Sequence, residues 1–249
     1  MLNIDSSKAG VFASETSRKR SSVTDQIKDF ILRRGLKSGD LMPTETEICA
    51  ELGVSRSSVR EAIRTLAALD IVEVKHGYGT YVGQLSLAPL VEGLVFRGVL
   101  RPQDDFAALR EVIEVREALD IVMGQQIVDA LHGQTDEVLE GLVSTMVSKS
   151  ETGTAFAEED LAFHTRLLAY LDNTLVGQLV TAFWEINTVL YPKLGIAPAE
   201  DIDDTARAHG AMLEAAKAGD LEAYRAAVVA HYQPLRRSLE KAALQSATD

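Results

Sequence analysis

Three of the five histidines in the sequence, His164, His209 and His231, fall inside segments with helical periodicity. Asp160 precedes His164 by four residues, which puts carboxylate and imidazole on one helix face, about one turn apart. Three neutral imidazoles and a carboxylate suit a borderline divalent cation, zinc first, with manganese or nickel as alternatives. An octahedral ion with these four ligands keeps about two positions open for water or a ligand carboxylate. The alternative is a surface hydrogen bond between Asp160 and His164, since the sequence alone does not show that the three helices converge.

A second group of residues carries positive charge at regular spacing. Arg56, Arg60 and Arg64 follow at intervals of four residues, so they share one helix face, and Ser57 lies beside them. Arginine side chains on such a face can read guanine edges bidentately in the major groove of DNA. The pattern therefore predicts a DNA-recognition helix.

The stretch from Pro43 to Leu69 must position these arginines. Thr44 and Glu47 have the spacing of a capping box at the start of a short helix, and Gly53 suits the left-handed residue that ends it. Ser55 is placed to cap a second helix. The apolar stripe of that second helix consists of Val59, Ile63 and Leu66. A short helix, a glycine turn and a second helix with an apolar back and an arginine front predict a helix-turn-helix.

Two β-rich runs follow, at residues 71–74 and 80–82, around a turn that contains glycine. Together they predict a hairpin. Directly behind a recognition helix, a hairpin is a wing, and Lys75 and His76 at its tip can reach phosphates or the minor groove. The alternative for His76 is an ordinary polar turn residue.

From residue 87 onward the pattern is helical. Helices are predicted over about 87–100, 104–132, 135–150, 156–171, 174–191, 201–218 and 221–243, with Asp172 or Asn173 as a cap and Pro192 as a stop. Seven helices of this kind form a bundle with its own core. We therefore predict a mainly α protein with a flexible tail at 1–17, a winged helix-turn-helix at 18–83 and an all-helical domain at 84–245. Within the predicted winged helix-turn-helix domain, the first helix spans about 22–34 and follows a basic cluster at residues 18–20.

The net charge of −12 is distributed unevenly along the chain. Residues 18–83 carry 11 Lys and Arg against 9 Asp and Glu, a net +2, whereas residues 84–249 carry 13 against 26, a net −13. This asymmetry fits a DNA-contacting head on an acidic body that DNA repels. The same acidity also suits a large helical domain that only has to stay soluble.

Composition also bears on location. The chain has no run of about 18 apolar residues and no apolar segment near its polar N-terminus, so we expect neither a transmembrane helix nor a secretory signal, and no membrane partner. The single cysteine, Cys49, cannot form a disulfide within the chain and is expected to be a small core residue. These features predict a cytoplasmic protein.

Both halves resemble the GntR family of bacterial transcription regulators, in its FadR subgroup with an FCD effector domain, over roughly residues 20–240. In the head the resemblance rests on GDLMPTETEICAELGVSRSSVREAIRTLAALDIVEVKHGYGTYV, which looks like the family signature of Pro-x-Glu, Val-Ser-Arg, Val-Arg-Glu-Ala and Gly-x-Gly-Thr. In the helical part it rests on VREALD at 115–120, DLAFH at 160–164, Asn173, His209, and the segment from Gly219 to His231.

The resemblance implies roles for residues of the head. Arg56 and Arg60 match the family's major-groove arginines, and His76 and Gly77 match the wing-tip residues that enter the minor groove. The family commonly has a base-reading arginine after the Glu of Pro-x-Glu, where this chain has Thr46, so its operator preference at that position should differ.

The resemblance also implies a metal-binding set in the helical domain. This set consists of Asp160, His164, His209 and His231. The family's Arg-x-x-Leu-Glu element ends here in Asp120, a mild change from glutamate.

Together these observations predict a ligand-responsive transcription regulator, with repression as the expected mode. A homodimer would hold two heads over a palindromic operator, with Arg18, Lys19 and Lys75 on phosphates. A small organic acid would bind at the metal, clamped by Arg116, whose alternative role is a structural salt bridge. The alternatives are a purely structural metal, a metal-dependent enzyme acting on small acids, and a DNA-binding module without a ligand.

Overall fold

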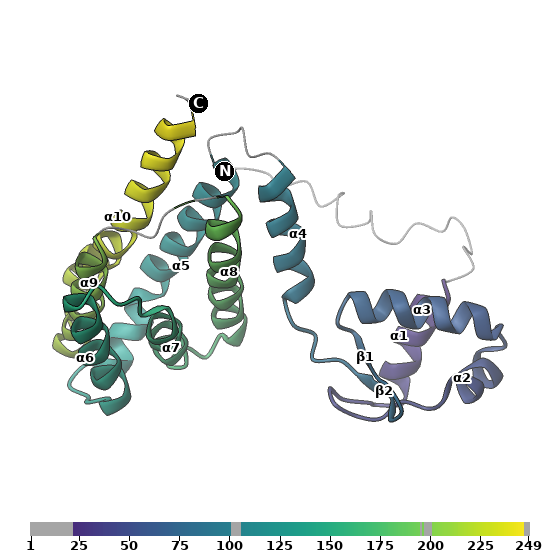
Figure 1. The fold of residues 1–249 in the computed structure, drawn as a ribbon. Coiled ribbons are helices and arrows are strands. Elements are labelled where there is room, and N and C mark those ends of the chain that lie inside the picture. The colour runs from purple at the N-terminus through teal and green to yellow at the C-terminus, as the bar shows by residue number, and fades with distance from the viewer. Residues whose placement is uncertain (1–21, 101–105, 195, 197–200, 247–249) are drawn as a thin grey trace, which may run out of the picture. The chain divides into compact units, whose positions relative to one another are not determined.

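The computed structural model describes residues 22–100, 106–194, 196 and 201–246, and the chain divides into two compact units, Met1–Ser86 and Leu87–Asp249 (Figure 1). Each unit has a separate hydrophobic core. We call the first unit the head and the second the helical domain. The predicted flexible tail and the basic cluster at residues 18–20 lie outside the described residues.

The described part of the head contains α1 (Val23–Arg33), α2 (Glu45–Leu52), α3 (Arg56–Ala68), β1 (Val72–Lys75) and β2 (Gly79–Val82). The predicted capping box at the start of α2 is present, since the side chains of Thr44 and Glu47 each accept a hydrogen bond from the other residue's backbone N–H. Gly53 ends α2 in the left-handed conformation at φ +66°, and the Ser55 hydroxyl caps α3. These local signals confirm the helix-turn-helix.

One face of each head helix is buried in a shared core. The core includes Ile27 and Phe30 of α1, Ile48 of α2, Val59, Ile63 and Leu66 of α3, and Val72 and Val82 of the hairpin. The strands pair antiparallel from Val72 opposite Val82 to Lys75 opposite Gly79, which confirms the predicted hairpin. Because the apolar stripe of α3 is used for this packing, its arginine face is left to solvent.

The segment that leaves the head is fastened to the end of α3. The Asp70 carboxylate accepts the backbone N–H of Ser86 at 2.8 Å, and the Asp70 carbonyl accepts that of Leu85 at 3.0 Å. Gly83 is required here, because a Cβ at this position would lie 2.2 Å from the Asp70 carbonyl oxygen. Residues 83–86 are therefore held by the head.

The described part of the helical domain consists of α4 (Ala88–Leu100), α5 (Ala107–Leu131), α6 (Glu137–Glu151), α7 (Ala157–Leu168), α8 (Thr174–Lys193), α9 (Ile202–Ala218) and α10 (Leu221–Ser246). The seven predicted helices are confirmed, and Asn173 caps α8 as expected. Pro192 was expected to stop α8 but lies inside its last turn. A proline near a helix end removes only one hydrogen bond, so the helix tolerates it there.

The helices of this domain pack around an apolar core that also encloses several polar residues. α9 and α10 run side by side, α5 packs on α10, and α8 packs against α4, α5 and α7 (Figure 1). The buried polar residues of α5 and α7–α10 are Arg116, Glu117, Asp120, His164, Asn187, His209 and His231. Buried polar groups are costly unless they are paired, so these residues define where a functional site is to be sought. Within the described residues, no helix is long and apolar enough to cross a membrane.

Candidate nucleic-acid interface and candidate metal centre

The exposed face of α3 carries the predicted DNA-contacting residues Arg56, Ser57, Arg60 and Arg64. Two of these arginines reach across to the start of α2. The Arg56 guanidinium donates to the Thr46 hydroxyl at 2.8 Å, and Arg60 Nε donates to the Glu45 carboxylate at 2.8 Å. Thr46, predicted as a DNA contact, thus orients a neighbouring arginine. Glu45 was missed, although it is the Glu of the Pro-x-Glu motif.

The two other predicted DNA-contacting cations, Arg64 and Lys75, are exposed and weakly paired. Arg64 lies 3.7 Å from Glu61, and Lys75 lies 3.3 Å from Glu73. Exposed ion pairs of this kind contribute about 0–1 kcal/mol, so these side chains can exchange their partners for phosphates. His76 and Gly77 lie exposed in the turn between β1 and β2. The predicted DNA-contacting residues therefore lie on α3, at the start of α2 and in the turn between β1 and β2.

The four predicted metal ligands come together in the helical domain. Asp160 and His164 lie on α7, His209 on α9 and His231 on α10, and their candidate ligand atoms all lie within 4.8 Å of one another. Asp160 Oδ1 is 2.8 Å from His209 Nε2 and 3.7 Å from His164 Nε2. His164 Nε2 is 3.3 Å from His231 Nε2. Three helices thus converge on one point.

Hydrogen bonding around this cluster fits a cation at its centre. His209 Nδ1 donates to the carbonyl oxygen of Thr205 at 2.8 Å, which leaves Nε2 to face Asp160. Neither Asp160 Oδ1 nor His209 Nε2 has a hydrogen-bond partner among the described residues, nor does His231 Nδ1. A carboxylate oxygen 2.8 Å from an imidazole nitrogen needs a cation between the two atoms, either a proton on the nitrogen or a metal ion. Metal–nitrogen bonds of about 2.1 Å put the ligand atoms of one ion about 3–4 Å apart, and the four candidate ligand atoms lie within 4.8 Å of one another.

The protonation states also suit metal binding. Burial, together with His209 and Arg116 nearby, lowers the pKa of His164 to about 3 against the opposing pull of Asp160. Burial likewise holds the pKa of His231 well below its usual value. Burial alone would raise the pKa of Asp160, but contact with His209 holds it well below its usual value. Neutral imidazoles and an ionised carboxylate are the ligand forms that a divalent metal requires.

Trp184 supports the candidate metal centre from α8. Its indole Nε1 donates to Asp160 Oδ2 at 2.6 Å, which leaves Oδ1 for the cluster. Partners of this kind fix the orientation of a ligating carboxylate. Sequence reasoning missed Trp184, and no spacing to Asp160 within the chain could have identified it.

Further buried polar groups belong to α5, α8 and α10. Arg116 is 2% exposed, stacks on the Tyr232 ring at 5.5 Å, and has no ion pair or hydrogen bond among the described residues. Tyr232 donates to Asp120 at 2.6 Å, and burial raises the pKa of Asp120 to about 6. Asn187 of α8 has no partner for its amide nitrogen or its amide oxygen in the described structure. An unmade hydrogen bond to a buried group costs about 1–3 kcal/mol.

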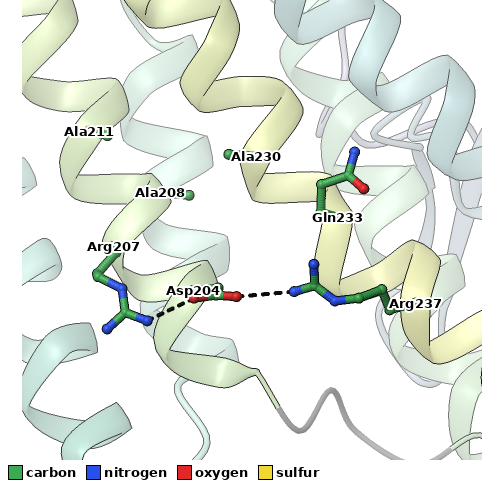
Figure 2. Close-up of a pocket in the computed structure, with 7 residues that line it drawn as sticks. All are labelled: Asp204, Arg207, Ala208, Ala211, Ala230, Gln233 and Arg237. Carbon is green, nitrogen blue, oxygen red and sulfur yellow. Dashed lines mark hydrogen bonds and ion pairs between the residues drawn. The ribbon is translucent and has the colours of Figure 1, made fainter.

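A groove of about 350 Å³ lies elsewhere, between α9 and α10. Ala208, Ala211 and Ala230 line it, and Figure 2 shows Asp204 bridging Arg207 and Arg237 across it. None of the predicted site residues lines this groove, and its arginines are already paired. The polar cluster inside the bundle is therefore the better candidate for a ligand site.

Comparison with known proteins gives two family matches. Residues 19–82 match the family described as bacterial regulatory proteins, gntR family, and residues 111–234 match the FCD domain. The putative transcriptional regulatory protein NedR of Micromonospora viridifaciens is 41% identical over 104 residues, covering 42% of this chain and 75% of that protein. The probable D-xylose utilization operon transcriptional repressor of Paenarthrobacter nicotinovorans is 29% identical over 218 residues, covering 85% of this chain and 86% of that protein.

A solved structure agrees with these matches. Streptococcus agalactiae GntR superposes with a TM-score of 0.63 at 26% identity, over 87% of this chain and 98% of that chain. The named relatives are transcription regulators rather than enzymes, so the enzyme alternative is set aside.

Replacing Arg60 by alanine tests the interface. Loss of a bidentate base contact should weaken operator binding by about 1–3 kcal/mol.

Replacing Glu45 by alanine should instead strengthen binding to random DNA, because it removes a carboxylate beside the phosphates, and should weaken the preference for the operator. Both effects are measured by fluorescence anisotropy, with an operator selected from random DNA. Lys28→Ala, a charge removal on α1, serves as the control and should change neither value. Unchanged operator affinity of Arg60→Ala would mean that α3 is not the recognition helix.

Metal content tests the second site. Elemental analysis of the wild-type protein should find about one metal per chain, which the His164→Ala, His209→Ala double variant should lose. Trp184→Phe keeps all four ligands but removes the donor to Asp160, so its metal affinity should fall by about 10–100-fold. The exposed His132 provides a control, because His132→Gln should retain the metal. Absence of metal from the wild type after reconstitution with zinc, manganese or nickel would show that the cluster is not a metal site.

Proposed function

Because the chain belongs to the GntR family of bacterial regulatory proteins and carries an FCD domain, we propose that it is a ligand-responsive transcription repressor. It binds a palindromic operator as a homodimer, and a small organic acid bound at or near a divalent metal in the helical domain releases the DNA. It acts on the bacterial chromosome, in the cytoplasm.

The observation that carries this proposal is the buried guanidinium of Arg116. It shares the interior of the helical domain with the cluster around Asp160, whose charge acts on it, yet no described carboxylate pairs with it. The next residue, Glu117, pairs with Arg236, so α5 does form structural ion pairs where a partner is available. A guanidinium matches a carboxylate bidentately, and an acid bound here would supply the missing partner.

The metal has a defined role in this scheme. Asp160, His164, His209 and His231 would hold it, and when bound it supplies open coordination positions and positive charge for an anionic ligand. Trp184 keeps the Asp160 carboxylate oriented, and Arg116 adds a second point of attachment. Two such anchors favour an acid over a neutral sugar, even though one relative is named for D-xylose utilization.

The head would act through residues already exposed for contact. Arg56 and Arg60 read base edges in the major groove, and Lys75, His76 and Gly77 reach the minor groove or phosphates. Arg64 contacts the backbone. The net charge of +2 over residues 18–83 and of −13 beyond them supports contact through the head alone.

A helix contact offers a route from the ligand to the head. α4 follows the head directly in the chain and packs on α8, where a Cβ at Gly98 would lie 2.8 Å from Leu190. Because the close packing at Gly98 leaves no room for α4 and α8 to move independently, a shift of α8 on ligand binding would also move α4. The movement of α4 would then reach the segment that enters the head. Release requires that the acid bind the two arrangements with different affinity.

Dimerisation is supported by the surface of α4. Its exposed large apolar side chains are Leu90, Phe96, Val99 and Leu100. Of these, Phe96, Val99 and Leu100 are spaced at i, i+3 and i+4 and share one face of α4. Exposed apolar groups of this kind mark interaction surfaces, so α4 is our candidate for the interface between two copies.

The regulatory proposal predicts that acid lowers operator affinity only through this site. A panel of small carboxylic acids, with D-xylose as neutral probe, is tested on metal-loaded protein by thermal shift and DNA binding. At least one acid should raise the melting temperature and weaken operator binding at least tenfold. Arg116→Met should keep the metal but lose the response, whereas Arg97→Met, which removes an exposed ion pair with Glu111, should respond normally.

Three results would change this interpretation. If no acid shifts the melting temperature or the DNA affinity, the protein is a DNA-binding module without a ligand of this class. A full response of Arg116→Met would remove Arg116 from the site. A full response after removal of the metal would make the metal structural.

The dimer has its own test. Phe96→Glu should convert a wild-type dimer to a monomer at micromolar concentration, because two charges would be buried across a two-fold interface. Analytical ultracentrifugation measures the mass. Val138→Glu alters another exposed apolar side chain, on α6, and should stay dimeric. A dimer that persists in Phe96→Glu would place the interface elsewhere.

A further inference from the structure

α8 presents a line of polar residues to the interior of the helical domain. Trp184, Asn187 and Tyr191 are spaced at i, i+3 and i+7, which places them within about 60° of arc on one helix face, over about 10 Å of its length. α8 packs against α5, which carries Arg116, and against α7, which carries Asp160. This face of α8 therefore connects the two anchors of the proposed acid site.

A hydrogen bond at one end of the line fixes its orientation. At one end, Trp184 donates to Asp160 at 2.6 Å. At the other end, the Tyr191 hydroxyl lies buried within the electrostatic reach of Arg116. Asn187 is the buried position between Trp184 and Tyr191 along the same face.

Asn187 has unused hydrogen-bonding capacity of a specific kind. Its side chain is 7% exposed, and neither Nδ2 nor Oδ1 has a partner among the described residues. The Tyr191 hydroxyl is also buried without a partner there. A buried amide offers donors and an acceptor together, and a hydroxyl group is the small group that can accept from one and donate to the other.

We propose that the effector is a carboxylic acid that also carries a hydroxyl group, and that Asn187, assisted by Tyr191, is the residue that recognises the hydroxyl. This inference rests on the proposed function, since it assumes that the carboxylate binds at Arg116 and the metal. An acid without the hydroxyl leaves both ends of the amide unpaired. A second carboxylate in that place can only accept, so it leaves the amide oxygen unpaired.

The test compares acids that differ by one hydroxyl group. Lactate is compared with propionate, malate with succinate, and 3-hydroxybutyrate with butyrate, on the full-length, metal-loaded protein by calorimetric titration. At least one hydroxy acid should bind at least tenfold more tightly than its partner. In Asn187→Leu, which has similar volume and no polar side-chain atoms, that hydroxy acid should lose at least tenfold in affinity, while its partner binds as before.

Controls separate recognition from folding and from direct ligation. Thr188→Val changes the next, exposed residue of α8 and should retain the preference. Metal content and far-UV circular dichroism show whether Asn187→Leu is folded, and Tyr191→Phe provides a second variant, with a smaller loss in the same direction. A hydroxyl held by the metal instead of the amide would keep its preference in both variants, and this result would overturn the inference.

Failure of the inference differs from failure of the proposed function. Equal affinity for the members of every pair, in a wild type that binds acids, would overturn the hydroxyl assignment and leave the acid-responsive repressor intact. If no acid of any pair binds the metal-loaded protein, both proposals fail.

Discussion

The helical domain depends on one electrostatic constraint, the enclosure of a carboxylate and three imidazoles in an apolar bundle. Asp160 Oδ1 and His209 Nε2 lie 2.8 Å apart, and the other ring nitrogen of His209 is used by the Thr205 carbonyl. The free energy of this arrangement is unfavourable until a cation joins the two atoms. Because the residues come from α7, α9 and α10, whatever satisfies the cluster also fixes three helices that are distant in the chain.

The same reasoning extends from the cluster to the residues around it. Arg116 and Asn187 are buried with unused capacity to donate, and Asn187 also to accept. Such groups lower the stability of the empty domain, and a ligand that pairs with them restores it by binding the folded state. The domain is thus less stable without its ligand and gains stability when the ligand binds, as a ligand-dependent switch requires.

Local spacing accounts for what the sequence could predict, and tertiary packing for what it could not. The caps at Thr44 and Ser55 depend on atoms three residues away, so the helix-turn-helix was predicted in detail. Asp160 and His164 were paired by helical spacing, whereas their meeting with His209 and His231 followed only from the family resemblance. The sequence did not predict the roles of Trp184 and Asn187 or the ion pair between Glu45 and Arg60, because each depends on how one helix packs against another.

One of these packing contacts has a spectroscopic consequence. Trp184 is the single tryptophan of the chain, and its indole N–H is bound to the carboxylate of Asp160. The emission of an indole depends on the charge and hydrogen bonding next to its ring. The tryptophan fluorescence of the protein therefore originates beside the candidate metal centre, so that occupancy of that centre can be followed in the native chain without an added label.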